Sequence, residues 1–571
     1  ISGKVQQNIS SLPEFETTYV GTPKLKGVSQ EVKVYCITSH GLPETDVSKV
    51  SAKLEEESKF NIFALTGGIL TAIGVAFWIA IGVFDVSFGG KTEVPSIAII
   101  PFDNKGAEED EFYAYSISSE LISDVTSAGL IRVASLKDIE KLDYPTLNNS
   151  ELSAKLLVRY IAQGTIWKAD SVFQLSMELY DTKTSKVLWS ESWQRAWNEL
   201  ASIKGNLADN ILKTLKVSTK QDITRAPSSN TEAYEYYLKS KYYYNTYMKL
   251  ADIQSLDIAR GLLEKAIELD NNLLAPKILL GRTYYFEKGD SEEHFHKVLT
   301  IARGLFEKAL KKAEELDDKF WIGRSLRNIG NTYYSFEDED KAYDYYIRSL
   351  KINEEIGDLD GMAHSLNNIG TCFRDKGDLD KALNYLIRTL EIREELGDKA
   401  SILHTQSGLG HTYRVKGNYD KALESYTVAL EISEEIEDKV EMGWAINSIG
   451  IIYLDKGNYE KAAEYLEKSV KINNELGGYH IALWSKVHLN LLYKNLGKTY
   501  LKQDIIQLIK GAQDTEYLIN FPLYQLLEDT SYLETAYNEV QEKADAMEEE
   551  LKLKFLSYPI PKAIVEEWEK V

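Results

Sequence analysis

The chain has 571 residues, enough for about three or four domains of about 100–200 residues each. Acidic residues outnumber basic residues by 88 to 66, giving a net charge of −22. This balance argues against nucleic acid as the main partner, because phosphate binding depends on a basic surface. The two cysteines, Cys36 and Cys372, are too few for a disulfide framework.

Residues 1–40 are too few to bury a hydrophobic core, so we expect them to be the end of a larger domain. Strand-forming residues dominate 31–37, and turn residues at Gly21 and Gly27 precede them, which favours a β-hairpin. The stretch "LKGVSQEVKVYCI" resembles the closing strand pair of class III adenylate/guanylate cyclases, and "ISGKVQQNI" resembles the helix before it.

This resemblance implies that residues 1–40 are the C-terminal tail of a cyclase catalytic domain, which converts ATP or GTP to a cyclic nucleotide. In that family the metal-binding aspartates and the transition-state Asn/Arg pair come earlier in the domain. We therefore expect no catalytic residue, metal or cofactor in this chain, and expect Mg or Mn for the missing cyclase part. The resemblance also implies a nucleotide-phosphate contact at Lys26, for which an exposed turn lysine is the alternative.

A linker at 41–59 leads to "FNIFALTGGILTAIGVAFWIAIGVF", residues 60–84, which contain no Asp, Glu, Lys or Arg. As a helix, this segment would reach about 37 Å, enough to cross a hydrocarbon core of about 30 Å, so we predict a transmembrane helix. Small residues recur at every fourth position, which predicts a face for dimerisation in the membrane unless the spacing is chance. They are Ala64, Gly68, Ala72, Ala76 and Ala80.

The predicted span and the cyclase resemblance together define a topology. A cyclase consumes nucleoside triphosphate, which is found in the cytoplasm, so the residues before the span would face inward. We therefore expect a single-pass protein of the bacterial inner membrane with a cytoplasmic N-terminus. Residues 85–571 would then be periplasmic or otherwise extracytoplasmic.

Residues 95–217 alternate between strand and helix patterns. Strands are predicted in "PSIAIIPFDN" and "LIRVAS", with a helix in "EDEFYAYSISSELISDVTSAG" between them. The segments "YIAQGTIWKAD", "VFQLSMELYD" and "KVLWSESWQRA" predict a three-stranded meander, and "NELASIKGNLADNILKTL" predicts a closing amphipathic helix. The whole segment resembles the TolB-like amino-terminal α/β domain of bacterial envelope and signalling proteins. It contains no nucleophile–base pair, glycine-rich phosphate loop or metal-ligand spacing.

Residues 231–510 repeat with a period of forty residues. Each repeat has a glycine, an aromatic residue three positions later and an alanine twelve positions later, so that two antiparallel helices can pack closely. The glycines are Gly330, Gly370, Gly410 and Gly450. HEAT repeats share the period, but this spacing resembles the longer variant of tetratricopeptide repeats. We therefore predict an all-α tetratricopeptide-repeat (TPR) solenoid, followed by capping helices over 511–571.

The first helices of stacked repeats line a concave groove, and we predict that this groove binds a peptide or protein partner. Asparagine amides can both donate to and accept from a peptide backbone, although the repeat consensus alone would also explain them. Arg374 and Arg414 would favour an acidic partner. The histidines in this region are joined by no carboxylate or cysteine in a fixed motif, so we expect no metal. The predicted groove residues are Arg327, Asn328, Asn331, Asn367, Asn368, Arg374, His404, His411, Arg414 and Asn447.

The predicted fold class is thus multidomain: a cyclase-tail β-hairpin, one transmembrane helix, an α/β TolB-like domain and an all-α TPR solenoid. The predicted function is the membrane anchor and extracytoplasmic sensor or interaction region of a homodimeric class III nucleotide cyclase in signal transduction. The alternative is a non-enzymatic TPR scaffold or adaptor protein of the envelope.

Overall fold

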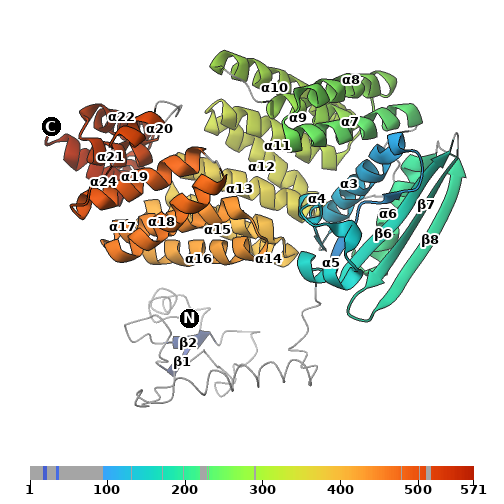
Figure 1. Cartoon of the computed structure of the whole chain (residues 1–571), viewed down its shortest axis with the longest axis horizontal. Helices are drawn as coiled ribbons and strands as arrows, with labels where there is room; N and C mark the ends of the chain where they lie inside the picture. The colour runs from blue at the N-terminus through green and yellow to red at the C-terminus, as the bar shows by residue number, and fades with distance from the viewer. Residues whose placement is uncertain are drawn as a thin grey trace. The chain divides into compact units, whose positions relative to one another are not determined.

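The chain divides into two compact units, Ile1–Thr92 and Glu93–Val571. In the first unit, β1 (Thr17–Gly21) pairs antiparallel with β2 (Val34–Ile37), as predicted for a hairpin, whereas Lys26 lies outside the described residues. The computed structural model describes residues 17–21, 34–37, 94–129, 131–169, 172–196, 199–218, 228, 230–287, 291–476, 479–500, 502–509 and 516–571 (Figure 1).

Among these described residues, no helix is long and apolar enough to cross a membrane. The longest of them, α10 (Glu292–Glu315), has 24 residues, but Glu and Lys side chains recur from its first turn to its last. This finding corrects the predicted fold class and the predicted single-pass membrane localisation, because the structure shows a mostly helical repeat solenoid that carries a small α/β layer. The predicted span, residues 60–84, lies outside the described residues. So does its predicted dimer face at Ala64, Gly68, Ala72, Ala76 and Ala80.

The α/β layer lies between residues 94 and 218 and is built on one open sheet, with the strand order β5-β3-β6-β7-β8 and with β4 also paired to β6. β3 lies parallel between β5 and β6, and β6, β7 and β8 form the predicted antiparallel meander. No TolB-like β-propeller occurs in the part of the chain that the structure describes. The strands are β3 (Ser96–Ile99), β4 (Asp103–Asn104), β5 (Arg132–Val133), β6 (Tyr160–Ala169), β7 (Val172–Asp181) and β8 (Lys186–Ala196).

Apolar and polar side chains alternate along β7, which explains how the sheet buries one face. Phe173, Leu175 and Leu179 are fully buried, because alternate side chains of a strand point to the same side. The helices α3 (Glu111–Ser127) and α6 (Leu200–Thr214) pack against this sheet and against each other, and both agree with their predicted positions. Two short helices, α4 (Leu136–Glu140) and α5 (Asn149–Leu156), connect β5 to β6.

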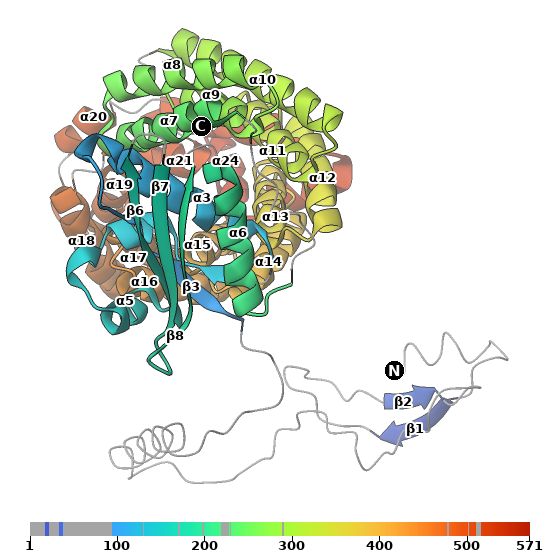
Figure 2. The ribbon, with the colours of Figure 1, turned by 90° about the vertical axis from the view of Figure 1, so that its right-hand side faces the viewer.

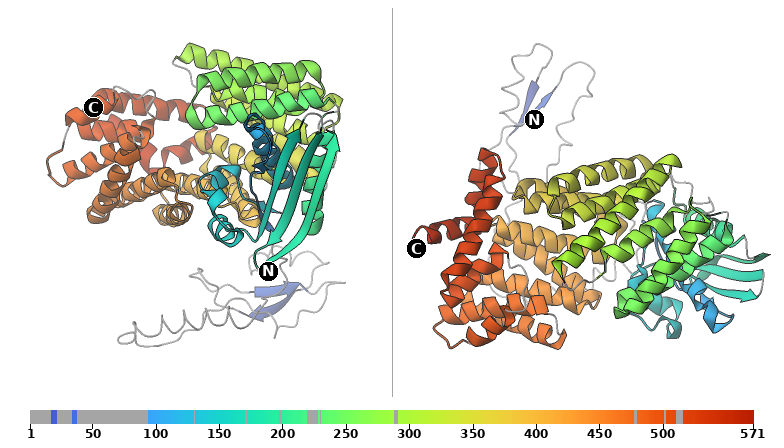
Figure 3. Two further views of the ribbon diagram at one scale, coloured as in Figure 1. Left: turned by 45° about the vertical axis from the view of Figure 1, so that its right-hand side comes forward. Right: turned by 90° about the horizontal axis from the view of Figure 1, so that it is seen from above.

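The predicted helical solenoid is confirmed, and its successive helix pairs follow one another along a curve (Figure 2). The last four helices lie beside the later repeats and are red in Figure 3. The helices are α7 (Thr231–Leu250), α8 (Ile253–Leu269), α9 (Leu274–Tyr285), α10, α11 (Lys319–Ser335), α12 (Glu339–Ile356), α13 (Leu359–Asp375), α14 (Leu379–Leu396), α15 (Lys399–Val415), α16 (Tyr419–Glu435), α17 (Lys439–Asp455), α18 (Tyr459–Leu476), α19 (Tyr479–Asn495), α20 (Lys502–Ile509), α21 (Tyr517–Leu527), α22 (Thr530–Asp545), α23 (Glu549–Leu556) and α24 (Pro559–Trp568).

The periodic glycines lie where the two helices of a pair approach most closely. A Cβ at Gly330 would lie 2.7 Å from the Tyr346 ring, and one at Gly410 would lie 2.8 Å from the Tyr426 ring. Real Cβ atoms do not come this close to other atoms, so only glycine permits this packing. The repeat period in the sequence therefore reflects a steric requirement at each helix pair.

The α/β layer and the first repeats share one hydrophobic core, which extends from β3 to α9. Glu120 on α3 is only 9% exposed and accepts a hydrogen bond of 2.7 Å from the Tyr237 hydroxyl of α7. The Lys241 ammonium of α7 forms an ion pair with the same carboxylate, and Ser116 Oγ donates to the Leu238 carbonyl at 2.7 Å. A buried carboxylate is stable only with such partners, so α3 is firmly attached to α7.

Substitution of the glycines by alanine should separate close packing from helix propensity. Gly410→Ala should lower the free energy of unfolding by about 1–3 kcal/mol, because the methyl group overlaps the Tyr426 ring. Gly261→Ala in α8 has no atom within 4 Å of the new Cβ and should raise stability by up to about 1 kcal/mol. Urea unfolding followed by circular dichroism measures both, and equal effects of the two variants would contradict the packing explanation.

The Arg159–Asp181 pair should make the α/β layer sensitive to acid. Hydrogen bonds from the Arg159 guanidinium, at 3.1 and 2.9 Å, hold the pKa of the buried Asp181 at about 2. Because the pKa of Asp181 is lower in the folded than in the unfolded chain, where it is about 4, the pair stabilises the fold at pH values above about 4. This stabilisation is lost as the pH falls towards 2.

Asp181→Asn should therefore cost about 2 kcal/mol at pH 7, and the difference from the wild type should narrow below pH 4. Urea unfolding at pH 7, 5 and 3 measures this difference. Exposed Asp143, which makes no side-chain cap hydrogen bond, provides the control variant Asp143→Asn. A difference that stays constant with pH would show that Asp181 acts through packing alone.

Candidate functional site

All ten predicted groove residues lie on first helices of repeats, which is the set of helices expected to line the concave face. Arg327, Asn328 and Asn331 lie on α11, and Asn367, Asn368 and Arg374 lie on α13. His404, His411 and Arg414 lie on α15, and Asn447 lies on α17. The structure divides them into side chains that are already bonded within the protein and side chains that are free to meet a partner.

The asparagines do not form one continuous row of free amides. Asn331 Oδ1 accepts hydrogen bonds from the Tyr346 hydroxyl at 2.9 Å and from Asn368 Nδ2 at 3.0 Å, which joins neighbouring repeats. Asn447 is 1% exposed, so solvent does not reach it. Asn328 donates to the Arg324 carbonyl at 2.8 Å, and the amide of Asn367 has no hydrogen bond among the described residues. Asn367 is therefore the one of the five asparagines whose amide is unbonded among the described residues and not buried.

Arg374 and Arg414 are neutralised within the solenoid. Arg374 Nε donates to Asp375 Oδ1 at 3.0 Å. Arg414, whose side chain is 6% exposed, lies 3.4 Å from Asp455 Oδ2. Burial raises the pKa of Asp455, and the adjacent Arg414 guanidinium opposes that rise. These two arginines are thus paired with neighbouring carboxylates and offer little unbalanced charge to an acidic partner.

Arg327 differs from them, because it has no hydrogen bond or ion pair among the described residues. It is only partly buried, and burial together with the neighbouring Arg324 and Arg282 lowers its pKa. Arg324, one helical turn earlier, donates to Ser123 Oγ of α3 at 3.3 Å. The α/β layer therefore borders the concave face at α11 and leaves Arg327 without a partner beside that contact.

The concave histidines are held in the neutral form or are solvent-exposed. His364 lies 3.6 Å from Asp360, which favours its charged form, but burial and the nearby arginines lower its pKa to about 4. Burial, Arg374 and Arg414 lower the pKa of His411 far below its usual value. His404 is 61% exposed and lies 3.7 Å from Glu441. The described residues contain no cluster of three or more His, Cys, Asp or Glu side chains that could hold a metal ion.

The C-terminal helices cover part of the solenoid, which sequence reasoning missed. Tyr517 and Leu518 of α21 pack in one cluster with Leu379 and Val415 of the repeats. Lys543 of α22 donates to the Asp375 carbonyl at 3.2 Å. The apolar run "YLINFPLYQLL" at 517–527 signals burial in the sequence, but it does not show which surface is covered.

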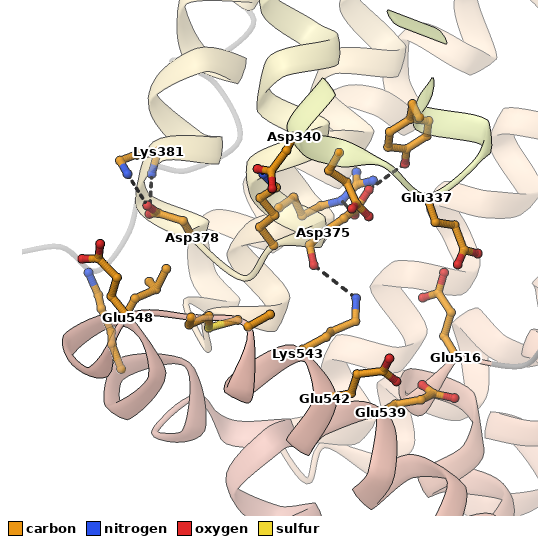
Figure 4. Close-up of a pocket in the computed structure, with 18 of the residues that line it drawn as sticks. Glu337, Asp340, Asp375, Asp378, Lys381, Glu516, Glu539, Glu542, Lys543 and Glu548 are labelled. Carbon is orange, nitrogen blue, oxygen red and sulfur yellow. Dashed lines mark hydrogen bonds and ion pairs between the residues drawn. The ribbon is translucent and has the colours of Figure 1, made fainter. Parts of the chain in front are cut away.

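A cleft of about 1640 Å³ lies between these C-terminal helices and the turns that join α11 to α12 and α13 to α14 (Figure 4). Ten carboxylates and five basic side chains line it. The basic groups are occupied, for example by ion pairs of Lys381 with Asp378 at 2.9 Å and of Lys376 with Asp340. In Figure 4 the carboxylates of Glu337 and Glu516 approach each other from opposite walls. Carboxylates outnumber basic groups in this cleft, so its charge disfavours an acidic chain.

Comparison with known proteins confirms the repeats. The tetratricopeptide-repeat family matches residues 322–395, 361–435 and 398–475. The chain is also 25% identical over 186 residues, or 32% of its length, to the Rhizobium meliloti (strain 1021) protein named "Putative adenylate cyclase 3". It spans about a third of that relative, 31% of its length. These comparisons confirm neither the cyclase-tail resemblance at 1–40 nor the TolB-like resemblance at 95–217.

Solved structures of low similarity were also found. The structure of a Rap protein complexed with Competence and Sporulation Factor is 18% identical, covers 59% of this chain and 97% of its own, and has a TM-score of 0.36. YrrB, described as a TPR protein with an unusual peptide-binding site, is 22% identical, covers 39% of this chain and 97% of its own, and has a TM-score of 0.27.

The contact between the C-terminal helices and the repeat turns can be tested at Gly377. Its φ is +78°, and an added Cβ would clash with Met547 Cε and lie 2.9 Å from Phe555. Gly457 occupies the same turn of a later repeat, with φ +71° and no atom within 4 Å of an added Cβ. Alanine strains the backbone at both positions, so the pair isolates the contact with Met547 and Phe555.

Gly377→Ala should raise hydrogen exchange in α23 by about tenfold, because overpacking costs about 1–3 kcal/mol. Gly457→Ala should leave exchange in α23 unchanged. Exchange measured by mass spectrometry on the full chain distinguishes the two variants. Equal exchange in α23 would mean that this contact does not hold the C-terminal helices in place.

Proposed function

We propose that this chain is a protein-interaction region that binds a peptide or protein partner on the concave face formed by α11, α13 and α15. The repeats of residues 322–475 supply stacked helix pairs, and such stacks present extended concave surfaces for binding. The single observation that carries the proposal is that polar side chains on these three helices remain unbonded or exposed. Arg327 and Asn367 have no side-chain partner among the described residues, and His404 is 61% exposed.

We further propose that this interaction region serves a nucleotide cyclase. The support is the 25% identity to the Rhizobium meliloti protein over 186 residues. The cyclase catalytic residues and the Mg or Mn ion would then belong to a separate catalytic domain, with Lys26 as a contact to nucleotide phosphate. Homodimer formation would follow from the need of such a domain for a second copy. The alternative is a scaffold or adaptor without enzymatic activity.

Partner binding can be tested by site-specific crosslinking on the full chain. A photoreactive benzoylphenylalanine at Asn367 should give a discrete crosslinked product in an extract of the source organism, because position 367 lies on the concave face. The same residue at Asn384, which is exposed on the second helix α14, should give none. Mass spectrometry then identifies the crosslinked protein. The absence of a product at 367, or equal products at both positions, would refute partner binding at this face.

A further inference from the structure

Three arginines of the first helices, and a fourth on the second helix α14, form no ion pair among the described residues. They are Arg282 of α9, Arg324 and Arg327 of α11 and Arg393 of α14. Burial is the main cause of the lowered pKa of Arg327; the neighbouring Arg324 and Arg282 lower it further, while Asp360 and Asp358 oppose the shift. We refer to these four residues as the arginine cluster.

Each member of the arginine cluster makes different contacts. Arg324 lies over the Phe320 ring at 4.5 Å and donates to Ser123 at 3.3 Å. Arg282 lies 5.7 Å from the centre of the Tyr244 ring. Arg393 is 6% exposed and donates to the Ser401 carbonyl at 2.9 Å, so it contributes charge but no accessible donor. Only Arg327 keeps all of its donors unused among the described residues.

Nearby carboxylates do not balance the arginine cluster. The groups that face Arg327 are Asp358 and Asp360. Asp358 is 3% exposed and accepts from the Gly361 amide at 2.9 Å as the cap of α13, and burial raises its pKa. Asp360 lies 3.6 Å from His364. Asp398, which accepts from the Ser401 amide at 3.2 Å, faces Arg393. Four guanidinium groups thus face three carboxylates, each of which already has a contact, in a chain whose net charge is −22.

Solvent reaches this part of the groove. The His364 side chain is 45% exposed and that of Asp360 is 30% exposed, so a ligand can approach between α11 and α13. The unbonded Asn367 amide lies on α13 at the position equivalent to Arg327 in the next repeat and can bind a peptide backbone. An unpaired guanidinium suits a carboxylate in particular, because it can donate two parallel hydrogen bonds to the two oxygens.

We propose that the arginine cluster binds the carboxylate side chains of an acidic peptide segment, with Arg327 as the anchoring residue and Arg324 beside it. This inference rests on the proposed partner binding at the concave face and specifies the chemical class of that partner. The acidic cleft next to the C-terminal helices does not compete for such a segment, because its own charge has the same sign.

Fluorescence anisotropy with fluorescein-labelled decaglutamate tests the inference on the full chain. Decaglutamate should bind the wild type, and Arg327→Gln should weaken binding at least tenfold, because truncating a charge-assisted pair removes the main anchor. Arg327→Lys keeps the charge but loses the paired donors, so it should bind with intermediate affinity. The control Arg348→Gln makes the same change in charge on the exposed surface of α12 and should alter binding less than twofold.

Circular dichroism of each variant verifies that the solenoid is folded. The inference is wrong if decaglutamate fails to bind the wild type, or if Arg327→Gln and Arg348→Gln bind decaglutamate with equal affinity. It is also wrong if a phosphoserine peptide binds the wild type and decaglutamate does not. Crosslinking at Asn367 that persists while decaglutamate fails would overturn only the acidic class of the partner. Loss of that crosslinking would overturn the proposed partner binding itself.

Discussion

Each helix pair from α9 to α18 is packed around one glycine, and the positions of the surfaces described above depend on that contact. At Gly330 and Gly410 the absence of a side chain lets the second helix bring a tyrosine ring against the backbone of the first. Lysines lie over the aromatic residue of each repeat, for example Lys381 over Phe373 at 5.0 Å. Because the pairs from α9 to α18 repeat this packing, their first helices turn the same face inward. Arg327 and Asn367 reach one surface for that reason, although forty residues separate them.

The α/β layer restricts that surface at one end. Its core continues into α7, α8 and α9, and Glu120 is buried between Tyr237 and Lys241. Removing one partner of a buried charge leaves that charge uncompensated, which costs more than the pair itself contributes. The layer and the first repeats are therefore one structural unit, and α3 is a fixed boundary of the concave face beside Arg324.

Periodicity in the sequence predicted the elements well where one physical rule dominated. The forty-residue glycine spacing located the helices from α11 to α18, and the alternation in "VFQLSMELYD" located β7 and its buried face. It could not predict which polar groove residues are free, because their partners lie a repeat away. Arg414 meets Asp455 and Asn331 meets Asn368 only after the repeats have stacked. The spacing in the sequence assigns a residue to a face of the solenoid. Which side chains on that face have no hydrogen-bond or ion-pair partner depends on contacts between neighbouring repeats.

The part of the solenoid that the C-terminal helices cover was likewise outside the reach of the sequence pattern. The run at 517–527 is apolar enough to require burial, yet nothing in it identifies Leu379 and Val415 as its neighbours. The membrane prediction rested on one apolar segment, 60–84, which lies outside the described residues, and no described helix is long and apolar enough to cross a membrane.

In a stack of repeats each repeat contacts only its neighbours, so small changes in packing at every interface add up along the stack. Here the repeats from α13 to α16 are tied at both edges. On one edge, the turns at Gly377 and Gly417 contact α23 and Pro559, and Lys554 pairs with Asp380. On the other edge, Gly397 packs on the Arg132 side chain of the α/β layer. We therefore expect the helices from α13 to α16 to shift less relative to one another than stacked repeats without such contacts would.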